Sequence, residues 1–191
     1  MTSAGSRSRG STGTSREAPA GPVVVLDDAA FAYTSSPVLT GVTGSVMPGE
    51  ALALIGPNGS GKTTLLRGLL GMVRITAGSL RVNGAAPGRA PRGSIGYVPQ
   101  VADLDPSFPV TVLDVVLMGT YSRLGLMRRP GRAERRRCRE ALDSVGLSEL
   151  ASRHFGTLSG GQRQRVLVAR CIAAEPSLIL LDEPFNGLDQ P

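Results

Sequence analysis

The stretch that decides the fold is residues 51–64, which read ALALIGPNGSGKTT. Its first part, 51–55, is a continuous apolar run, which is typical of a buried parallel strand. Residues 56–63 fit the pattern G-x-x-x-x-G-K-[ST], in which successive backbone N–H groups turn inward around phosphate oxygens. Residues 63–70 then space their leucines as a helix does. Strand, glycine loop and helix together predict a site for a nucleoside triphosphate, and they disfavour the alternative of a purely structural glycine turn.

Lys62 is the one lysine among the 21 basic residues, and every other one is arginine. The wide planar fork of an arginine would not fit inside a tight backbone loop wrapped around phosphates, whereas a compact ammonium would. We therefore expect Lys62 to contact the outer phosphates and the hydroxyl of Thr63 to bind Mg²⁺. The glycines at 56, 59 and 61 permit the backbone conformations and the close approach that such a loop needs.

A second apolar run, Leu178–Leu181, ends in Asp182 and Glu183. An acid that follows a buried strand lands at its carboxyl end, which we expect to lie beside the glycine loop. Asp182 would hold Mg²⁺ through water, and Glu183 would orient the attacking water as a general base. The alternative is a buried strand that ends in a polar turn, and the glycine loop elsewhere in the chain disfavours it.

Residues 158–162 read LSGGQ, and a helix is expected to follow them. Ser-Gly-Gly at the start of a helix is a second anion-binding end. One nucleotide does not need two such cradles on one chain. The pattern therefore predicts two chains that face each other, each closing the other's nucleotide site.

Composition excludes several classes of protein. No apolar run approaches the ~20 residues of a membrane span, and the N-terminal arginines are not followed by the apolar stretch of a signal peptide. Cys138 and Cys171 show neither metal-ligand nor disulfide spacing. Residues 1–22 are rich in Ser, Gly, Thr, Ala and Arg, so we expect a disordered tail there.

The net charge of +6 is concentrated in residues 128–139, which contain seven arginines. One interpretation is a patch for nucleic acid or acidic lipid. The other is a solvated helix face, tempered by Glu134 and Glu140. No aromatic residues are interleaved to stack on bases, so nucleic acid is not expected as a partner.

The remaining pattern predicts further strands and helices. Strands are expected at 23–26, 31–33, 38–46, 79–82 and 94–98. Helices are expected at 111–119, at 132–145, and from the end of the LSGGQ stretch to about residue 174.

The chain resembles the ATP-binding-cassette (ABC) ATPases from about Val23 to Asp189. The residues that carry the resemblance are the P-loop 56–64, Gln100 after Tyr-Val-Pro, the signature 158–162, and 178–183. It implies an α/β fold, a P-loop NTPase with a mostly parallel central sheet and an N-terminal antiparallel β subdomain. An α-helical subdomain would be inserted at about 102–165, within an ATPase domain of 23–191.

The resemblance implies ATP and Mg²⁺ as cofactors. Catalytic roles fall to Glu183, Lys62 and Gln100, and metal-binding roles to Thr63, Gln100 and Asp182. Tyr33 is similar to the aromatic residue that stacks on adenine, with a core tyrosine as the alternative. Asp189 is similar to the aspartate of the dimer interface. The implied nucleotide-binding residues are Tyr33, Gly56, Pro57, Asn58, Gly59, Ser60, Gly61, Lys62, Thr63, Thr64, Ser159, Gly160, Gly161 and Gln162.

A narrower resemblance lies in residues 108–119 and 121–129, which are similar to the ATPases of zinc, manganese and iron-chelate uptake systems. It implies a subunit that hydrolyses ATP to energise uptake through an integral membrane permease. Further implied partners are a second ATPase copy, forming a homodimer, and an extracytoplasmic substrate-binding protein. The subunit would be peripheral, on the cytoplasmic face of the cell membrane. Non-transport ABC ATPases, in DNA repair or on ribosomes, and a module that binds ATP without efficient turnover are the alternatives.

The chain departs from the family pattern after Asp189. The family has a further strand there and a switch histidine that contacts the γ-phosphate, whereas the one histidine of this sequence, His154, precedes the signature. The resemblance therefore implies a C-terminally incomplete domain. In such a domain we expect ATP binding to be retained and hydrolysis to be impaired.

Overall fold

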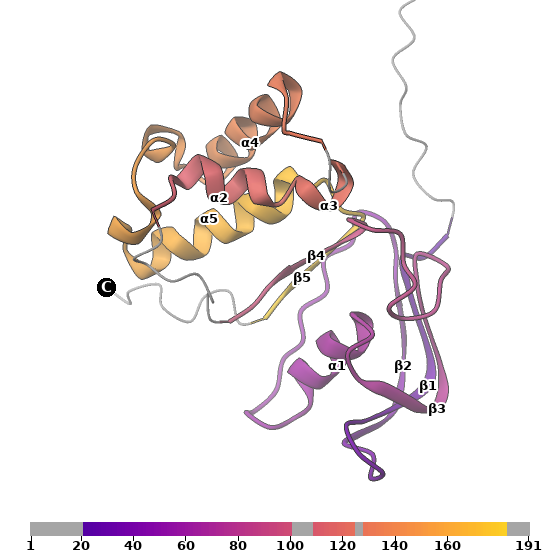
Figure 1. Ribbon diagram of the computed structural model, residues 1–191. Coiled ribbons are helices and arrows are strands. Elements are labelled where there is room, and N and C mark those ends of the chain that lie inside the picture. Colours follow the sequence, from indigo (N-terminus) through magenta and orange to yellow (C-terminus); the bar gives the residue numbers. More distant parts are fainter. Residues whose placement is uncertain (1–20, 101–108, 125–127, 183–191) are drawn as a thin grey trace, which may run out of the picture.

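The computed structural model describes residues 21–100, 109–124 and 128–182 (Figure 1). An antiparallel sheet with helix α1 forms one group of elements, and a cluster of helices forms another. A pair of parallel strands lies between these groups in the view of Figure 1. Glu183, Asp189 and residues 1–20 of the expected tail 1–22 lie outside the described residues.

The antiparallel sheet is built around β1 (Val24–Ala32), which lies between β2 (Leu39–Val46) and β3 (Arg74–Val82). The two strand segments expected at 23–26 and 31–33 are thus one strand. It changes register on both sides near Asp28, whose φ of 44° is in the left-handed region. Apolar side chains of this sheet and of α1 form a common core that includes Val24, Phe31, Leu66, Leu69, Leu80 and Val82.

The parallel pair consists of β4 (Ile95–Val98) and β5 (Leu178–Leu181). Ile95 pairs with Leu178 and Val98 with Leu181, so the two strands end at the same edge. The residues that follow each strand are therefore brought to that edge from positions about 80 places apart in the sequence.

The helical cluster consists of α2 (Val112–Met118), the short α3 (Tyr121–Leu124), α4 (Arg132–Ser144) and α5 (Gly160–Ala173). Two single turns of 3₁₀ helix, η1 (Ser148–Leu150) and η2 (Phe155–Thr157), connect α4 to α5. In the described part of the chain, no helix is long and apolar enough to cross a membrane. The core of the cluster includes Val112, Val115, Val116, Cys138, Leu142, Phe155, Val166 and Leu167. The subdomain boundaries expected from the sequence stay a prediction.

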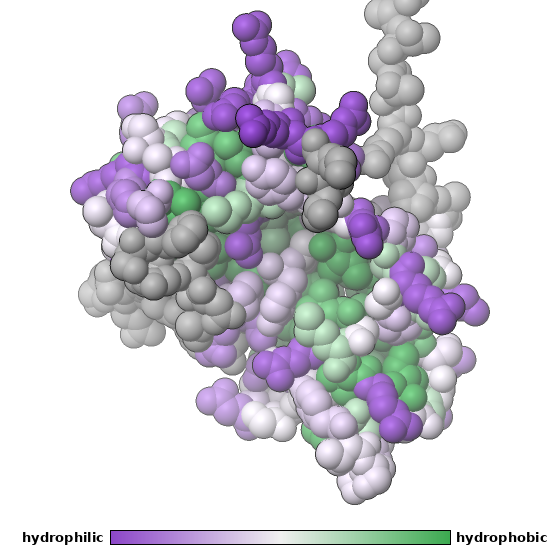
Figure 2. Space-filling view, in the orientation of Figure 1, coloured by the Kyte–Doolittle hydropathy of each residue, from purple (hydrophilic) through white to green (hydrophobic). Residues whose placement is uncertain are grey.

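Helix α4 carries the arginine-rich segment on its exposed side, and Figure 2 shows hydrophilic side chains gathered over it. Arg136 pairs with Glu140 at 3.6 Å, and Arg137 pairs with Glu134 at 3.0 Å. This is the solvated helix face that one of the two interpretations predicts. A binding role for the same face stays untested.

The prediction of a buried strand at 51–55 is wrong for this structure. The segment belongs to no strand, and its side chains are exposed, with Leu52 at 69% and Ile55 at 94%. A strand forms only where a neighbouring strand accepts and donates its backbone hydrogen bonds, and no described strand pairs with this segment. Strand β5 is buried on one face only, since Leu180 is 5% exposed whereas Ile179 and Leu181 are 41% and 40% exposed.

Candidate functional site

The glycine loop has the local conformations that its sequence predicts. Gly59 and Gly61 have φ angles of 82° and 91°, which only glycine adopts readily. Gly61 precedes α1 (Lys62–Leu69), and no side chain caps this end of the helix. The N–H groups of the first helical turn therefore remain available to a ligand, and the helix dipole favours an anion there.

Lys62 folds back into the loop. Its ammonium Nζ donates to the carbonyl oxygens of Gly56 and Pro57, at 2.8 and 3.0 Å. These two carbonyls hold the positive charge inside the loop before any anion arrives. An ammonium has three N–H donors, so phosphate oxygens can be bound by the same group with little movement of the side chain.

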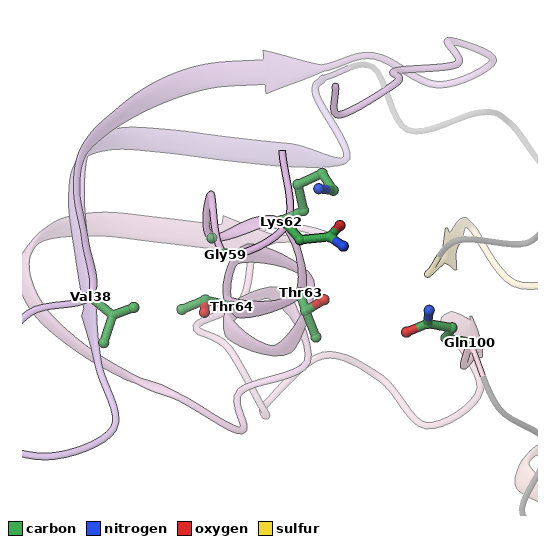
Figure 3. A pocket seen from close by; sticks show the side chains of 8 residues that line it. Val38, Gly59, Lys62, Thr63, Thr64 and Gln100 are labelled. Carbon is green, nitrogen blue, oxygen red and sulfur yellow. The ribbon is translucent and has the colours of Figure 1, made fainter. Parts of the chain in front are cut away.

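A cavity of about 390 Å³ opens beside the loop (Figure 3). Its volume lies within the roughly 300–1,000 Å³ of small-molecule sites. Figure 3 shows the hydroxyl of Thr63 and the side chain of Gln100 facing each other across it. Gln100 comes from the chain after β4, so the fold brings it to the P-loop, and its role at the metal stays a prediction. The cavity is lined by Val38, Asn58, Gly59, Gly61, Lys62, Thr63, Thr64 and Gln100.

Asp182 follows β5 and is 6% exposed. Its oxygen Oδ1 accepts a hydrogen bond from the Thr63 hydroxyl at 3.3 Å, and Oδ2 accepts one from the Tyr97 hydroxyl at 3.2 Å. A hydroxyl and a carboxylate are hard oxygen donors of the kind that Mg²⁺ prefers. The pair Thr63 and Asp182 therefore fits the metal-binding roles expected of it.

Tyr97 is the residue that sequence reasoning missed. Burial raises the pKa of its phenol, and the negative charge of Asp182 raises that pKa further. The parallel register places Tyr97 opposite Leu180, two residues before Asp182. Once β4 and β5 are paired in this register, the proximity can be inferred. The sequence motif alone does not reveal the contact of the hydroxyl.

Tyr33 lies just after β1 and is 49% exposed. Its hydroxyl accepts a hydrogen bond of 3.5 Å from Arg67 on α1, and this contact raises the pKa of the guanidinium. Tyr33 is not among the residues that line the cavity. Its exposed ring leaves room for stacking on a base, and that role stays a prediction.

The signature residues have a local structural role. Ser159 is the N-cap of α5, where its Oγ accepts from the Gln162 N–H at 3.3 Å and its own N–H donates to Gln162 Oε1 at 3.0 Å. This reciprocal capping box shapes the start of the helix. Neither these two residues nor Gly160 and Gly161 line the cavity. Their predicted contact with a nucleotide on a second copy stays a prediction.

These features define a P-loop nucleotide-binding fold: the antiparallel sheet, the parallel pair of strands and the glycine loop before α1. Residues 39–186 match the family model described as "ABC transporter". The match covers most of the chain, and the chain therefore belongs to the ABC transporter ATPase family. The family resemblance and the α/β P-loop fold expected from the sequence are confirmed.

Two of the similar proteins are named as ATP-binding proteins of metal transport systems. The chain is 45% identical over 166 residues to the "Zinc transport system ATP-binding protein TroB" of Treponema pallidum, covering 87% of this chain and 62% of that protein. It is 42% identical over 166 residues to the "Manganese transport system ATP-binding protein MntB" of Bacillus subtilis, covering 87% and 66%. The chain thus spans less than two thirds of the length of each of these relatives.

Solved structures agree with the fold. A structure of a "metal-chelate type ABC transporter" in an inward-facing conformation superposes with a TM-score of 0.75 at 38% identity, covering 88% of this chain and 62% of that one. The structure of cbiO1 from Clostridium perfringens, part of the cbiONQ transporter complex, gives 0.74 at 29% identity, covering 88% and 68%.

Proposed function

We propose that this chain is the ATP-binding and ATP-hydrolysing subunit of an ABC transporter that energises uptake of zinc, manganese or a metal chelate. The observation that carries the proposal is the site formed by the Lys62 ammonium, held by two loop carbonyls, and the contact of 3.3 Å between Thr63 and Asp182. The transport systems named for the similar proteins support the class of cargo.

In the proposed site, the N–H groups at the start of α1 bind phosphate oxygens and Lys62 binds the outer phosphates. Bound Mg²⁺ supplies positive charge that offsets the negative charge developing on the transferred phosphate. Thr63 and Asp182 would hold this ion, and the side chain of Gln100 lines the same cavity as Thr63. Glu183 is the proposed general base that orients the attacking water.

The proposed assembly contains two copies of the chain. Ser159 and the glycines after it would close the nucleotide site of the other copy, a role that their position outside the cavity of their own chain supports. Partners of the dimer would be an integral membrane permease and an extracytoplasmic substrate-binding protein. The dimer would lie on the cytoplasmic face of the membrane.

The substitution Glu183→Gln tests this function. It keeps the shape of the side chain and removes the base, so ATP should close the dimer without being cleaved. Sedimentation with Mg²⁺ and ATP should show a dimer with nucleotide trapped in it, whereas omission of Mg²⁺ or ATP should give monomers. A variant that stays monomeric under all conditions would refute the proposed dimer, and a variant that dimerises but converts the bound ATP to ADP would refute the assignment of the base.

A further inference from the structure

We propose that Tyr97 is a positioning residue for the metal-binding carboxylate. Its hydroxyl holds Oδ2 of Asp182, so that the other oxygen, Oδ1, stays turned toward Thr63 at the edge of the phosphate site. The inference rests on the proposed function, because it concerns the same nucleotide site. Tyr97 itself does not line the cavity and acts through Asp182.

The backbone fixes where the two side chains can meet. Tyr97 pairs in register with Leu180, and the N–H of Asp182 donates to the carbonyl of Val98 at 3.0 Å. Asp182 is therefore anchored beside the end of β4, with its carboxylate within reach of the phenol. A displacement of Asp182 along the strand direction would break this backbone hydrogen bond.

Each of the two hydroxyls donates a hydrogen bond to a different oxygen of the Asp182 carboxylate. Thr63 donates to Oδ1 and Tyr97 donates to Oδ2, so a rotation that exchanges the two oxygens must break both bonds. In the described part of the chain, these are the side chains that hydrogen-bond the carboxylate. Arg67, the nearby cation on α1, donates to Tyr33 instead. The hydroxyl of Tyr97 therefore fixes the orientation of Oδ2.

Burial makes this hydrogen bond necessary. Asp182 is 6% exposed, and a buried carboxylate oxygen without a donor is unfavourable because it has lost its water. A phenylalanine at position 97 would keep the ring and leave Oδ2 without its donor. The carboxylate would then turn toward other donors, and Oδ1 would leave the orientation in which it can hold the ion through water. Loss of an outer-shell partner of a metal ligand weakens metal affinity by about 10- to 100-fold.

The test compares Tyr97→Phe with Tyr121→Phe, which removes a phenol hydroxyl from the exposed side of α3. Binding of radiolabelled ATP is measured by equilibrium dialysis in EDTA and across a MgCl₂ titration. Tyr97→Phe should need about 10- to 100-fold more Mg²⁺ than the parent for half-maximal enhancement of ATP binding. Its ATP binding in EDTA should be unchanged. Tyr121→Phe should titrate as the parent does. An unchanged Mg²⁺ requirement for Tyr97→Phe, or an equal loss of binding in EDTA, overturns the proposal.

A double-mutant cycle separates positioning from a general structural effect. In an Asp182→Asn background, Tyr97→Phe should cause no further change in the Mg²⁺ titration, because the group that it positions no longer carries the charge. Additive effects would contradict the inference. Lys62→Ala serves as the reference for the proposed function. If it binds ATP like the parent, the proposed function fails; if it loses ATP while Tyr97→Phe titrates normally, only the positioning role fails.

Discussion

The contact between α1 and the antiparallel sheet makes one prediction that can be worked out from distances. Gly68 lies in α1, six residues after Lys62, and packs on Phe31 of β1. A Cβ added at Gly68 would lie 2.5 Å from Cε1 and 2.7 Å from Cδ1 of that ring. Ordinary carbon contacts are about 3.5–4.0 Å. Gly68→Ala therefore requires a displacement of about 1 Å between the helix and the sheet, or of the ring itself.

Two effects of opposite sign decide the outcome. Alanine is favoured over glycine inside a helix by about 0.8–1.0 kcal/mol. Overpacking a close-packed core costs roughly 1–3 kcal/mol, and Phe31 is 0% exposed, so its ring has little room to yield. We expect Gly68→Ala to lower the free energy of unfolding by about 1 kcal/mol, which lowers Tm by about 2–4 °C for a domain of this size.

Thermal melting followed by circular dichroism measures this change. Gly160→Ala, at the start of α5, is the control, because no atom lies within 4 Å of its added Cβ, and it should not lower Tm. In the double variant with Phe31→Leu, the smaller side chain relieves the contact, so the combined cost should be less than the sum by more than about 0.5 kcal/mol. A higher Tm for Gly68→Ala, or additive costs in the double variant, would refute the packing argument.

Three further predictions concern stability. Burial raises the pKa of the Cys138 thiol from 9.0 to about 11, so the folded state keeps a proton that the unfolded state releases. The free energy of unfolding should therefore fall as the pH rises from about 9 to 11. Urea titrations of Cys138→Ala should show a weaker fall than those of the parent, and an unchanged pH dependence would count against the contribution of the Cys138 thiol. Ser159→Ala removes the cap of α5 and should cost about 1 kcal/mol in urea unfolding, whereas Ser159→Asp, which still accepts a hydrogen bond, should cost less; equal costs would contradict the capping role. Glu175→Gln weakens half-exposed ion pairs to Arg123 and Arg137, so it should cost less than about 1 kcal/mol, and a cost that persists in 1 M NaCl would argue against the ion pairs.

The phosphate site was predictable because its residues are close in sequence or fixed by strand ends. Residues 56–63 form a local loop, and its conformation follows from glycine positions. The contact between Thr63 and Asp182 spans 119 positions, and the apolar run 178–181 predicts the position of Asp182 at the carboxyl end of a strand, although the run before the loop forms no strand. Gln100 follows β4, which ends at the same edge as β5.

The features that the sequence did not predict correctly also have specific physical causes. The apolar run 51–55 predicts a strand, but apolar character does not tell whether a neighbouring strand is there to pair with it. The contact of Tyr97 depends on the register of β4 against β5, which no local pattern encodes. Ser159 has a polar side chain that suits both a capping box and a phosphate contact, so its sequence position alone does not separate the two roles.

The measurement that tests the account most directly is ATP binding by Lys62 variants. Equilibrium dialysis with Mg²⁺ and ATP compares the parent with Lys62→Ala, with Lys62→Arg, and with Arg139→Ala as a control that removes an exposed cation from α4. We expect saturable binding by the parent and by Arg139→Ala. We expect loss of binding for both Lys62 variants, because the loop around the carbonyls of Gly56 and Pro57 accepts an ammonium and not a guanidinium. Undiminished binding by Lys62→Ala would contradict this expectation.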